Sequence, residues 1–299
     1  MKQFIKDVVF VSIFITIPIV VGEILFSYRN NEYRYKSNYM QYHSDKISIL
    51  LLGNSLFANS FDPHIFGDSA FNCATAARTS YYDVRILQKY APQMKNLKVV
   101  IFPVSAALPY PPHTDKYQVF SYKRYMNISS GMFFFENSAF LSSQMNLRGA
   151  KVKPIFKEVP YGYDNEEQYI DSLGYSPIFK EWDGEHEYIQ YPQYNDIIRA
   201  EEHYSKDIQN MAIICDSLNV RFIIVLPPVT NHYIEKTDSR IWNELEKMMN
   251  NLSRKNKIEY KNYYNDSLFR LNILYADELH LNYHGASLFA KRVKEDFNL

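Results

Sequence analysis

The first hydrophobic run lies near the start of the chain and is the longest. It reads VVFVSIFITIPIVVGEILFSY over residues 8–28, and about 20 apolar residues are enough to cross a bilayer. Lys2 and Lys6 precede it, as expected for a cytoplasmic N-terminus. Pro18 interrupts the run, which offers no small-residue cleavage site for a signal peptidase. We therefore expect residues 1–28 to be an uncleaved membrane anchor, with an amphipathic or buried helix as the alternative.

Beyond the first 45 residues, short apolar runs alternate with amphipathic stretches. The apolar runs predict strands at residues 47–52, 70–73, 98–103, 221–226 and 258–264. Helical periodicity predicts helices at residues 80–94, 197–219, 239–256 and 283–297. Strands that alternate with helices form a parallel sheet with right-handed crossovers. The expected fold class is therefore α/β, a flavodoxin-like three-layer sandwich with a central parallel sheet of about five strands, preceded by the transmembrane helix.

Two segments do not fit this alternation. Residues 29–45 are polar and aromatic without a clear period, so we expect a linker. Residues 104–195 hold many Pro and Tyr residues and an acidic run at 157–190. A stretch this long between a strand and its helix is typical of an insertion beside a site. We expect a domain at residues 46–299 with this insertion, whose acidic run is a solvated face rather than a cation site.

Composition and charge exclude some functions. The 299 residues include 33 basic and 33 acidic side chains, which gives no electrostatic case for binding nucleic acid. A 46% hydrophobic content is enough for a full core. Cys73 and Cys215 lack metal-ligand spacing, so we expect no metal and no cofactor. Two buried thiols are the preferred reading, with a single disulfide as the alternative.

Candidate chemistry appears at the two ends of the expected domain. Ser55 directly follows the first strand, in LLLGNSL, and ligands of parallel sheets bind at the carboxyl ends of strands. Asp277 and His280 stand three residues apart in DELHLNYHG, before the last helix. A hydrolytic serine needs a base, and a histidine base needs a carboxylate to orient it. Singly, Ser55 could cap a helix and Asp277 could bond a turn; together they predict a catalytic triad.

These motifs, with FNCATAA after the second strand, resemble the SGNH or GDSL-like hydrolase superfamily. With its anchor, the chain is similar to membrane-anchored members that acylate bacterial surface polymers. The resemblance implies that Ser55 is the nucleophile, His280 the general base and Asp277 the residue that orients it. It also implies an oxyanion hole made by the N–H groups of Ser55 and Ala74, with Ser105 as a third donor.

The sequence departs from the family pattern around this oxyanion hole. The second motif usually has glycine where this chain has Ala74, and the third motif usually supplies an asparagine where Ser105 is the nearest donor. Loss of one oxyanion donor costs about 100- to 1000-fold in rate. The departures leave the expected fold unchanged and bear on catalytic strength.

The expected function is a serine-dependent esterase or O-acyltransferase that acts on acyl groups, above all acetyl, of an extracytoplasmic glycan or a small acyl ester. The alternative is a non-catalytic SGNH-like partner of an integral-membrane O-acyltransferase. The altered oxyanion motifs favour this alternative slightly. The expected location is the cell membrane, with a single span and the large domain outside the cytoplasm, periplasmic or extracellular.

Overall fold

The computed structural model describes residues 1–27, 31–106, 116–131, 170–184 and 191–299. The strands in this part of the chain are β1 (Ile49–Leu51), β2 (Ala70–Asn72), β3 (Val99–Pro103), β4 (Arg221–Leu226) and β5 (Ile258–Asn262). The α-helices are α1 (Lys2–Ser27), α2 (Glu32–Tyr42), α3 (Ser55–Ala58), α4 (Ser80–Tyr90), α5 (Lys116–Met126), α7 (Tyr194–Ser217), α8 (Asn231–Lys236), α9 (Ser239–Lys255) and α10 (Tyr283–Phe297). Short 3-10 helices are Ser44–Lys46, Pro63–Phe66, Ala91–Gln93, Ser267–Phe269 and Asn272–Leu274.

The strands form one sheet in the order β2-β1-β3-β4-β5, and every neighbouring pair is parallel. Leu50 of β1 lies opposite Phe71 on one side and Val100 on the other. All residues of β1 are buried, which explains why this stretch of sequence is apolar throughout. The expected fold class is confirmed for the described residues, and the carboxyl ends of the strands share one edge of the sheet.

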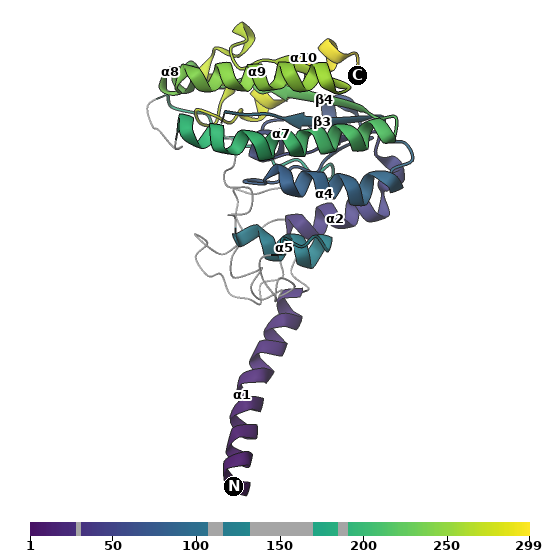
Figure 1. The fold of residues 1–299 in the computed structure, drawn as a ribbon, viewed down its shortest axis with the longest axis vertical. Coiled ribbons are helices and arrows are strands. Elements are labelled where there is room, and N and C mark those ends of the chain that lie inside the picture. The colour runs from purple at the N-terminus through teal and green to yellow at the C-terminus, as the bar shows by residue number, and fades with distance from the viewer. Residues whose placement is uncertain (28–30, 107–115, 132–169, 185–190) are drawn as a thin grey trace.

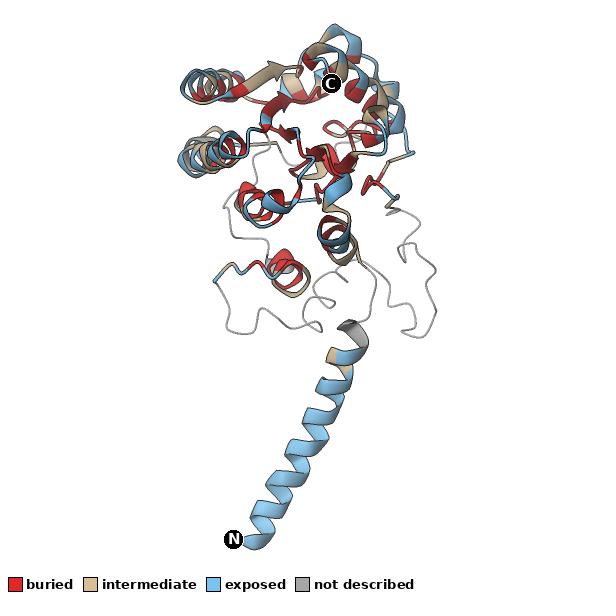
Figure 2. Cartoon of the chain, turned by 90° about the vertical axis from the view of Figure 1, so that its right-hand side faces the viewer, coloured by how far each residue is buried: buried red, intermediate tan, exposed pale blue. Residues whose placement is uncertain are grey.

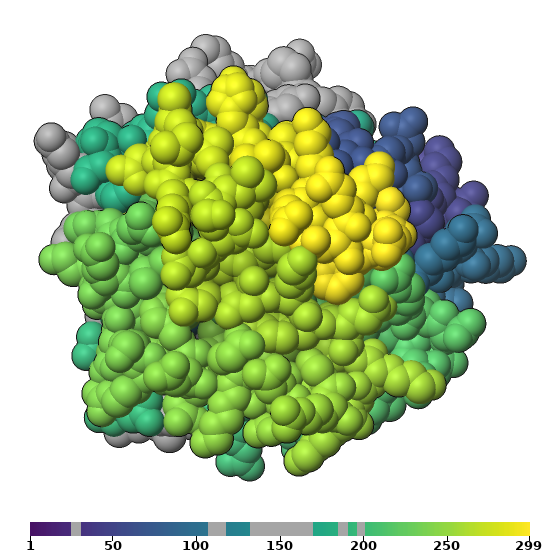
Figure 3. Space-filling view, turned by 90° about the horizontal axis from the view of Figure 1, so that it is seen from above, coloured from purple at the N-terminus to yellow at the C-terminus, as the bar shows by residue number. Residues whose placement is uncertain are grey.

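The two faces of the sheet support two separate cores. Leu50 and Val100 pack into a core shared with α4, α7 and α9. Leu51 and Ile101, one residue further along, pack into a second core with α3 and α10, because successive side chains of a strand point to opposite faces. The result is the expected three-layer sandwich (Figure 1). Figure 3 shows the C-terminal segments, in yellow-green to yellow, on the end of the domain that lies away from α1.

Helix α1 projects from the domain and is pale blue, thus exposed, over nearly all of its described surface (Figures 1 and 2). Its stretch Lys2–Ile24 is long and apolar enough to cross a membrane, with a mean hydropathy of 2.3 over an 18-residue window. The helix continues through Pro18, although the proline was expected to interrupt it. The expected anchor thus has the required length and composition, and its placement in a membrane stays a prediction.

The expected linker at residues 29–45 is instead largely helix α2, packed on the domain. Asn31 caps its first turn by accepting a hydrogen bond from the Arg34 N–H at 3.0 Å. Its buried residues are Tyr33, Lys36, Ser37 and Met40, which recur at helical spacing. This face mixes Lys and Ser with apolar residues, so hydrophobicity alone shows no period.

Most of the expected insertion lies outside the described residues, as does most of its acidic run. Of the described parts, α5 packs on α2. Residues 170–184 run beside the expected site: Ser176 N–H donates to Ala58 O at 3.0 Å, and Trp182 N–H donates to Tyr275 O at 2.8 Å. This segment therefore contacts α3 and the loop before α10, while the boundaries of the insertion stay a prediction.

Because α2 is part of the core, shortening its buried face should destabilise the domain. Met40→Ala should lower the free energy of unfolding by about 2–5 kcal/mol, as large-to-small core substitutions do, since Met40 is fully buried. Tyr42→Ala, on the exposed end of the same helix, is the control. Urea unfolding of the full chain measures both, and equal midpoints for Met40→Ala and wild type would show that α2 is a loose linker after all.

Candidate active site

Ser55, His280 and Asp277 meet at the carboxyl edge of the sheet. The His280 Nε2 atom lies 2.8 Å from Ser55 Oγ. On the other side of the ring, Nδ1 lies 2.8 Å and 3.0 Å from the two carboxylate oxygens of Asp277. Both contacts of a serine–histidine–carboxylate relay are therefore present, across 225 residues of sequence. The structure brings together the three residues that the sequence assigned to the triad.

Ser55 owes its position to a tight turn at the end of β1. Gly53 has a φ of +112°, and a Cβ there would lie 2.5 Å from the Pro103 ring, so only glycine fits. Asn54, not Ser55, caps the short helix α3, because its side chain accepts a hydrogen bond from the Leu56 N–H at 3.1 Å. The Ser55 hydroxyl is therefore not used as a cap and is available to His280.

The loop before α10 fixes the base and its carboxylate. Asp277 Oδ1 accepts hydrogen bonds from the N–H groups of Leu279 and His280, both at 2.8 Å. Ala276 N–H donates to His280 O at 2.8 Å, which closes the turn. Asn282 then caps α10 through the N–H of the second and third residues that follow it. The imidazole thus stands on a turn that is hydrogen-bonded on both sides.

Electrostatics keep the Asp277 carboxyl ionised. Burial acts to raise its pKa, but the hydrogen bonds and charge of His280, together with the N–H of Leu279, outweigh burial and place the pKa below its ordinary value. An ionised carboxylate at neutral pH can hold the Nδ1 proton and stabilise the imidazolium that forms when Nε2 takes a proton. The arrangement is competent for general-base activation of Ser55.

The expected oxyanion hole is only partly supported. The Ala74 N–H donates to Asn72 Oδ1 at 3.0 Å, and Ala74 is fully buried, so the assignment of Ala74 as a donor is corrected. The physical reason is that an asparagine two residues earlier folds back on this amide. The Ser55 N–H has no partner within the described residues. Ser105 is buried just past β3, and its role stays a prediction.

A buried polar network lies behind the site, and it was not predicted from the sequence. Asp83 Oδ1 accepts from the Gly53 N–H at 3.0 Å and from Arg78 Nη1 at 2.9 Å. Arg78 also donates to Cys73 O at 2.5 Å and to Tyr122 Oη at 2.7 Å. Arg78 and Asp83 are both 1% exposed. The network ties the turn that carries Ser55 to the loop after β2.

Lys36 of α2 reaches the same loop from the other side. Its Nζ atom donates to Ala74 O and lies 3.8 Å from Glu32 Oε1. The Lys36 side chain is fully buried, and this burial lowers its pKa although Glu32 acts to raise it. No sequence signal marks Lys36, Arg78 or Asp83, because charged residues are placed on the surface by default. Cys73 and Cys215 are buried free thiols, as preferred from the sequence.

No known family profile and no curated protein matches the sequence. Among solved structures, the chain is similar to a candidate acylhydrolase from Bacteroides fragilis, at 12% identity and a TM-score of 0.43 over 87% of this chain and 94% of the other. It is also similar to a GDSL-like lipase from Bacteroides thetaiotaomicron, at 10% identity and a TM-score of 0.42 over 89% and 100%. A third is a candidate platelet activating factor from Streptococcus pneumoniae, at 9% identity and a TM-score of 0.47 over 97% and 99%.

These similarities concern the fold, and the chemistry of this chain rests on its own residues. The α/β fold is shown by the parallel sheet of this chain itself, and the resemblance of its motifs to the SGNH superfamily stays a prediction. Ser55 follows the first strand of a parallel sheet, Asp277 and His280 precede the last helix, and the three side chains meet at one edge.

Removing one partner of the buried ion pair between Arg78 and Asp83 should lower the free energy of unfolding far more than removing one partner of an exposed ion pair. Asp83→Asn leaves the Arg78 guanidinium buried without a carboxylate, so the free energy of unfolding should fall by about 3–5 kcal/mol. Glu259→Gln opens the exposed pair with Arg221 and should cost at most about 1 kcal/mol. Chemical denaturation measures both variants, and similar losses would show that the buried pair has no special weight.

The buried Lys36 should change how the free energy of unfolding depends on pH. Its lowered pKa means that the folded protein binds fewer protons there than the unfolded chain between that lowered pKa and about pH 10.4, so over this range the residue makes stability rise with pH. From pH 7.5 to 9.5, the urea midpoint of wild type should therefore rise relative to that of Lys36→Met. Lys95→Met, at an exposed position, should shift in parallel with wild type. A constant gap between wild type and Lys36→Met would refute the lowered pKa.

Proposed function

We propose that this protein is a serine esterase or O-acyltransferase of the SGNH type that acts on acyl groups of an extracytoplasmic glycan or related polymer. The observation that carries the proposal is the continuous set of contacts from Ser55 Oγ through His280 to Asp277, with distances of 2.8 Å on each side of the imidazole. A serine hydroxyl is a weak nucleophile without such a base. The composition, with no net charge, suits a neutral polymer as well as a small ester.

The reaction follows from the geometry. His280 Nε2 takes the Ser55 hydroxyl proton as Oγ attacks the acyl carbonyl, and the developing oxyanion can be bound by the Ser55 N–H. The C–O bond to the leaving alcohol then breaks, and His280 returns the proton to that alcohol, which leaves an acyl-serine. In the second half, His280 activates either water, which gives hydrolysis, or a sugar hydroxyl, which gives transfer. Both outcomes use the same residues.

A non-catalytic role is the second candidate, and one observation favours it. The Ala74 N–H is already bonded to Asn72 Oδ1, so one expected oxyanion donor is occupied. An SGNH-like domain with a weak oxyanion hole would suit a binding partner of an integral-membrane O-acyltransferase. The two candidates differ in whether Ser55 reacts covalently.

Triad variants separate these candidates. With 4-nitrophenyl acetate, Ser55→Ala and His280→Ala should each remove nearly all activity, and the double variant should be little worse, because triad residues act as a unit. Asp277→Asn should cost less than removal of the serine. Ser217→Ala, an exposed serine of α7, should match wild type, and a fluorophosphonate probe should label wild type but not Ser55→Ala. Equal slow turnover by wild type and Ser55→Ala, without labelling, would favour the binding partner.

We also propose that α1 anchors the protein in the cell membrane with the large domain outside the cytoplasm. Its length, its hydropathy and the two lysines at its start, Lys2 and Lys6, which precede the apolar run, support this. Protease added to intact spheroplasts should digest the large domain and leave a cytoplasmic control protein intact. A large domain that resists digestion until the spheroplasts are lysed would place it inside the cell.

A further inference from the structure

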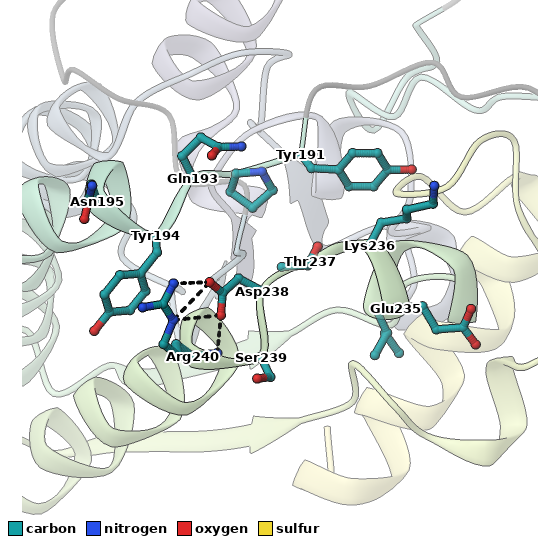
Figure 4. Close-up of a pocket in the computed structure, with 12 residues that line it drawn as sticks. Tyr191, Gln193, Tyr194, Asn195, Glu235, Lys236, Thr237, Asp238, Ser239 and Arg240 are labelled. Carbon is teal, nitrogen blue, oxygen red and sulfur yellow. Dashed lines mark hydrogen bonds and ion pairs between the residues drawn. The ribbon is translucent and has the colours of Figure 1, made fainter.

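A cavity of about 720 Å³ opens outside the triad, between residues 191–195, which lead into α7, and residues 236–240, which join α8 to α9 (Figure 4). Small-molecule sites in proteins typically measure about 300–1,000 Å³. The described residues that line the cavity do not include Ser55, Asp277 or His280. The proposed ester chemistry therefore leaves this cavity without a role.

The wall of the cavity is attached to the loop of the triad. Thr230, which caps α8, donates from both its N–H, at 3.1 Å, and its Oγ1, at 2.9 Å, to Glu278 O. The Tyr191 hydroxyl lies 3.2 Å from Glu278 Oε1. Glu278 is fully buried and directly follows Asp277. The cavity therefore adjoins the triad loop, at the carboxyl edge of the same sheet.

The charges of the cavity are balanced, and one oppositely charged pair among them is held in place. Its lining includes two acidic and two basic side chains, namely Glu235, Lys236, Asp238 and Arg240. Asp238 holds the Arg240 guanidinium through Nε at 3.0 Å and Nη2 at 2.5 Å. The guanidinium also lies over the Tyr194 ring, 4.2 Å from its centroid. Figure 4 shows this group of three at one end of the cavity and Tyr191 at the other.

These features select a class of ligand. A balanced set of charges gives no advantage to a strongly anionic or cationic molecule, and a lining rich in charged and amide groups does not suit an acyl chain. A sugar hydroxyl both donates and accepts, so neighbouring hydroxyls can bond the Asp238 carboxylate and the Arg240 guanidinium together. The exposed amides of Gln193 and Asn195 add further donors and acceptors.

We propose that this cavity is a subsite for a neutral saccharide unit, which holds the polymer beside the triad loop. The proposal rests on the proposed function for its purpose, because the subsite would present an acylated glycan to Ser55. Its chemistry is independent, since binding of a saccharide here requires no reaction at the serine. Arg240 and Asp238 are then recognition residues of the polymer and take no part in bond breaking.

Direct binding tests the subsite apart from the esterase. The full chain carrying Ser55→Ala, held in lipid nanodiscs to avoid sugar-headed detergents, would be titrated with tetramers of glucose and of N-acetylglucosamine, and with a uronic acid tetramer. At least one neutral tetramer should bind, more tightly than the anionic one, and Arg240→Ala should weaken that binding about 10-fold, as loss of a charged hydrogen bond does. Arg221→Ala, which opens another exposed ion pair at the start of β4, should leave it unchanged.

Kinetics supply the second test. With an acetylated oligosaccharide, Arg240→Ala should raise KM about 10-fold and leave kcat nearly unchanged, and it should not affect 4-nitrophenyl acetate, which has no sugar. Binding of a neutral tetramer that depends on Arg240, without esterase activity, would support the subsite and refute the proposed function. Esterase activity with no tetramer bound at 5 mM, and with Arg240→Ala equal to Arg221→Ala, would overturn the subsite alone.

Discussion

The buried ion pair between Arg78 and Asp83 is the interaction on which the site depends. Taking two charges out of water is costly, and such a pair persists only where further hydrogen bonds complete it. Here Asp83 also accepts from the Gly53 N–H, and Arg78 also bonds Cys73 O and Tyr122 Oη. The pair thus joins the turn before Ser55, the loop after β2, and helices α4 and α5. The position of the serine is therefore a property of the folded domain, not of its own turn alone.

The sequence predicted the sheet well because its strands are short, apolar and separated by amphipathic helices. Arg221–Leu226 matches the predicted strand, and β1 is shorter at both ends than its apolar run of residues 47–52. It predicted α2 poorly, since the buried face of that helix carries Lys36 and Ser37. Hydrophobic periodicity cannot mark a helix whose inward face includes a charge that is satisfied by a backbone carbonyl of another segment.

The candidate site likewise contains residues that could be predicted from the sequence and contacts that could not. Ser55, Asp277 and His280 were predictable because each sits in a short motif next to an element boundary. The hydrogen-bond partner of the Ala74 N–H could not be predicted in this way. It depends on whether the Asn72 side chain turns back towards the backbone or points outward. Asn72 Nδ2 also donates to Phe57 O at 2.7 Å, so the side chain is held from two sides. Such a choice is made by packing around the residue, which no local pattern encodes.

The packing of α2 also sets where the protein can work. Only residues 28–31 separate α1 from α2, and a chain covers at most about 3.5 Å per residue. With α1 embedded as proposed, the domain stays within a short tether of one membrane leaflet. It would then meet membrane-linked polymers by diffusion within a plane, where two tethered molecules collide far more often than the same molecules dispersed in a volume. Polymers released from the membrane would no longer meet the domain in this way. The tether itself would therefore restrict which polymers the protein can act on, and when.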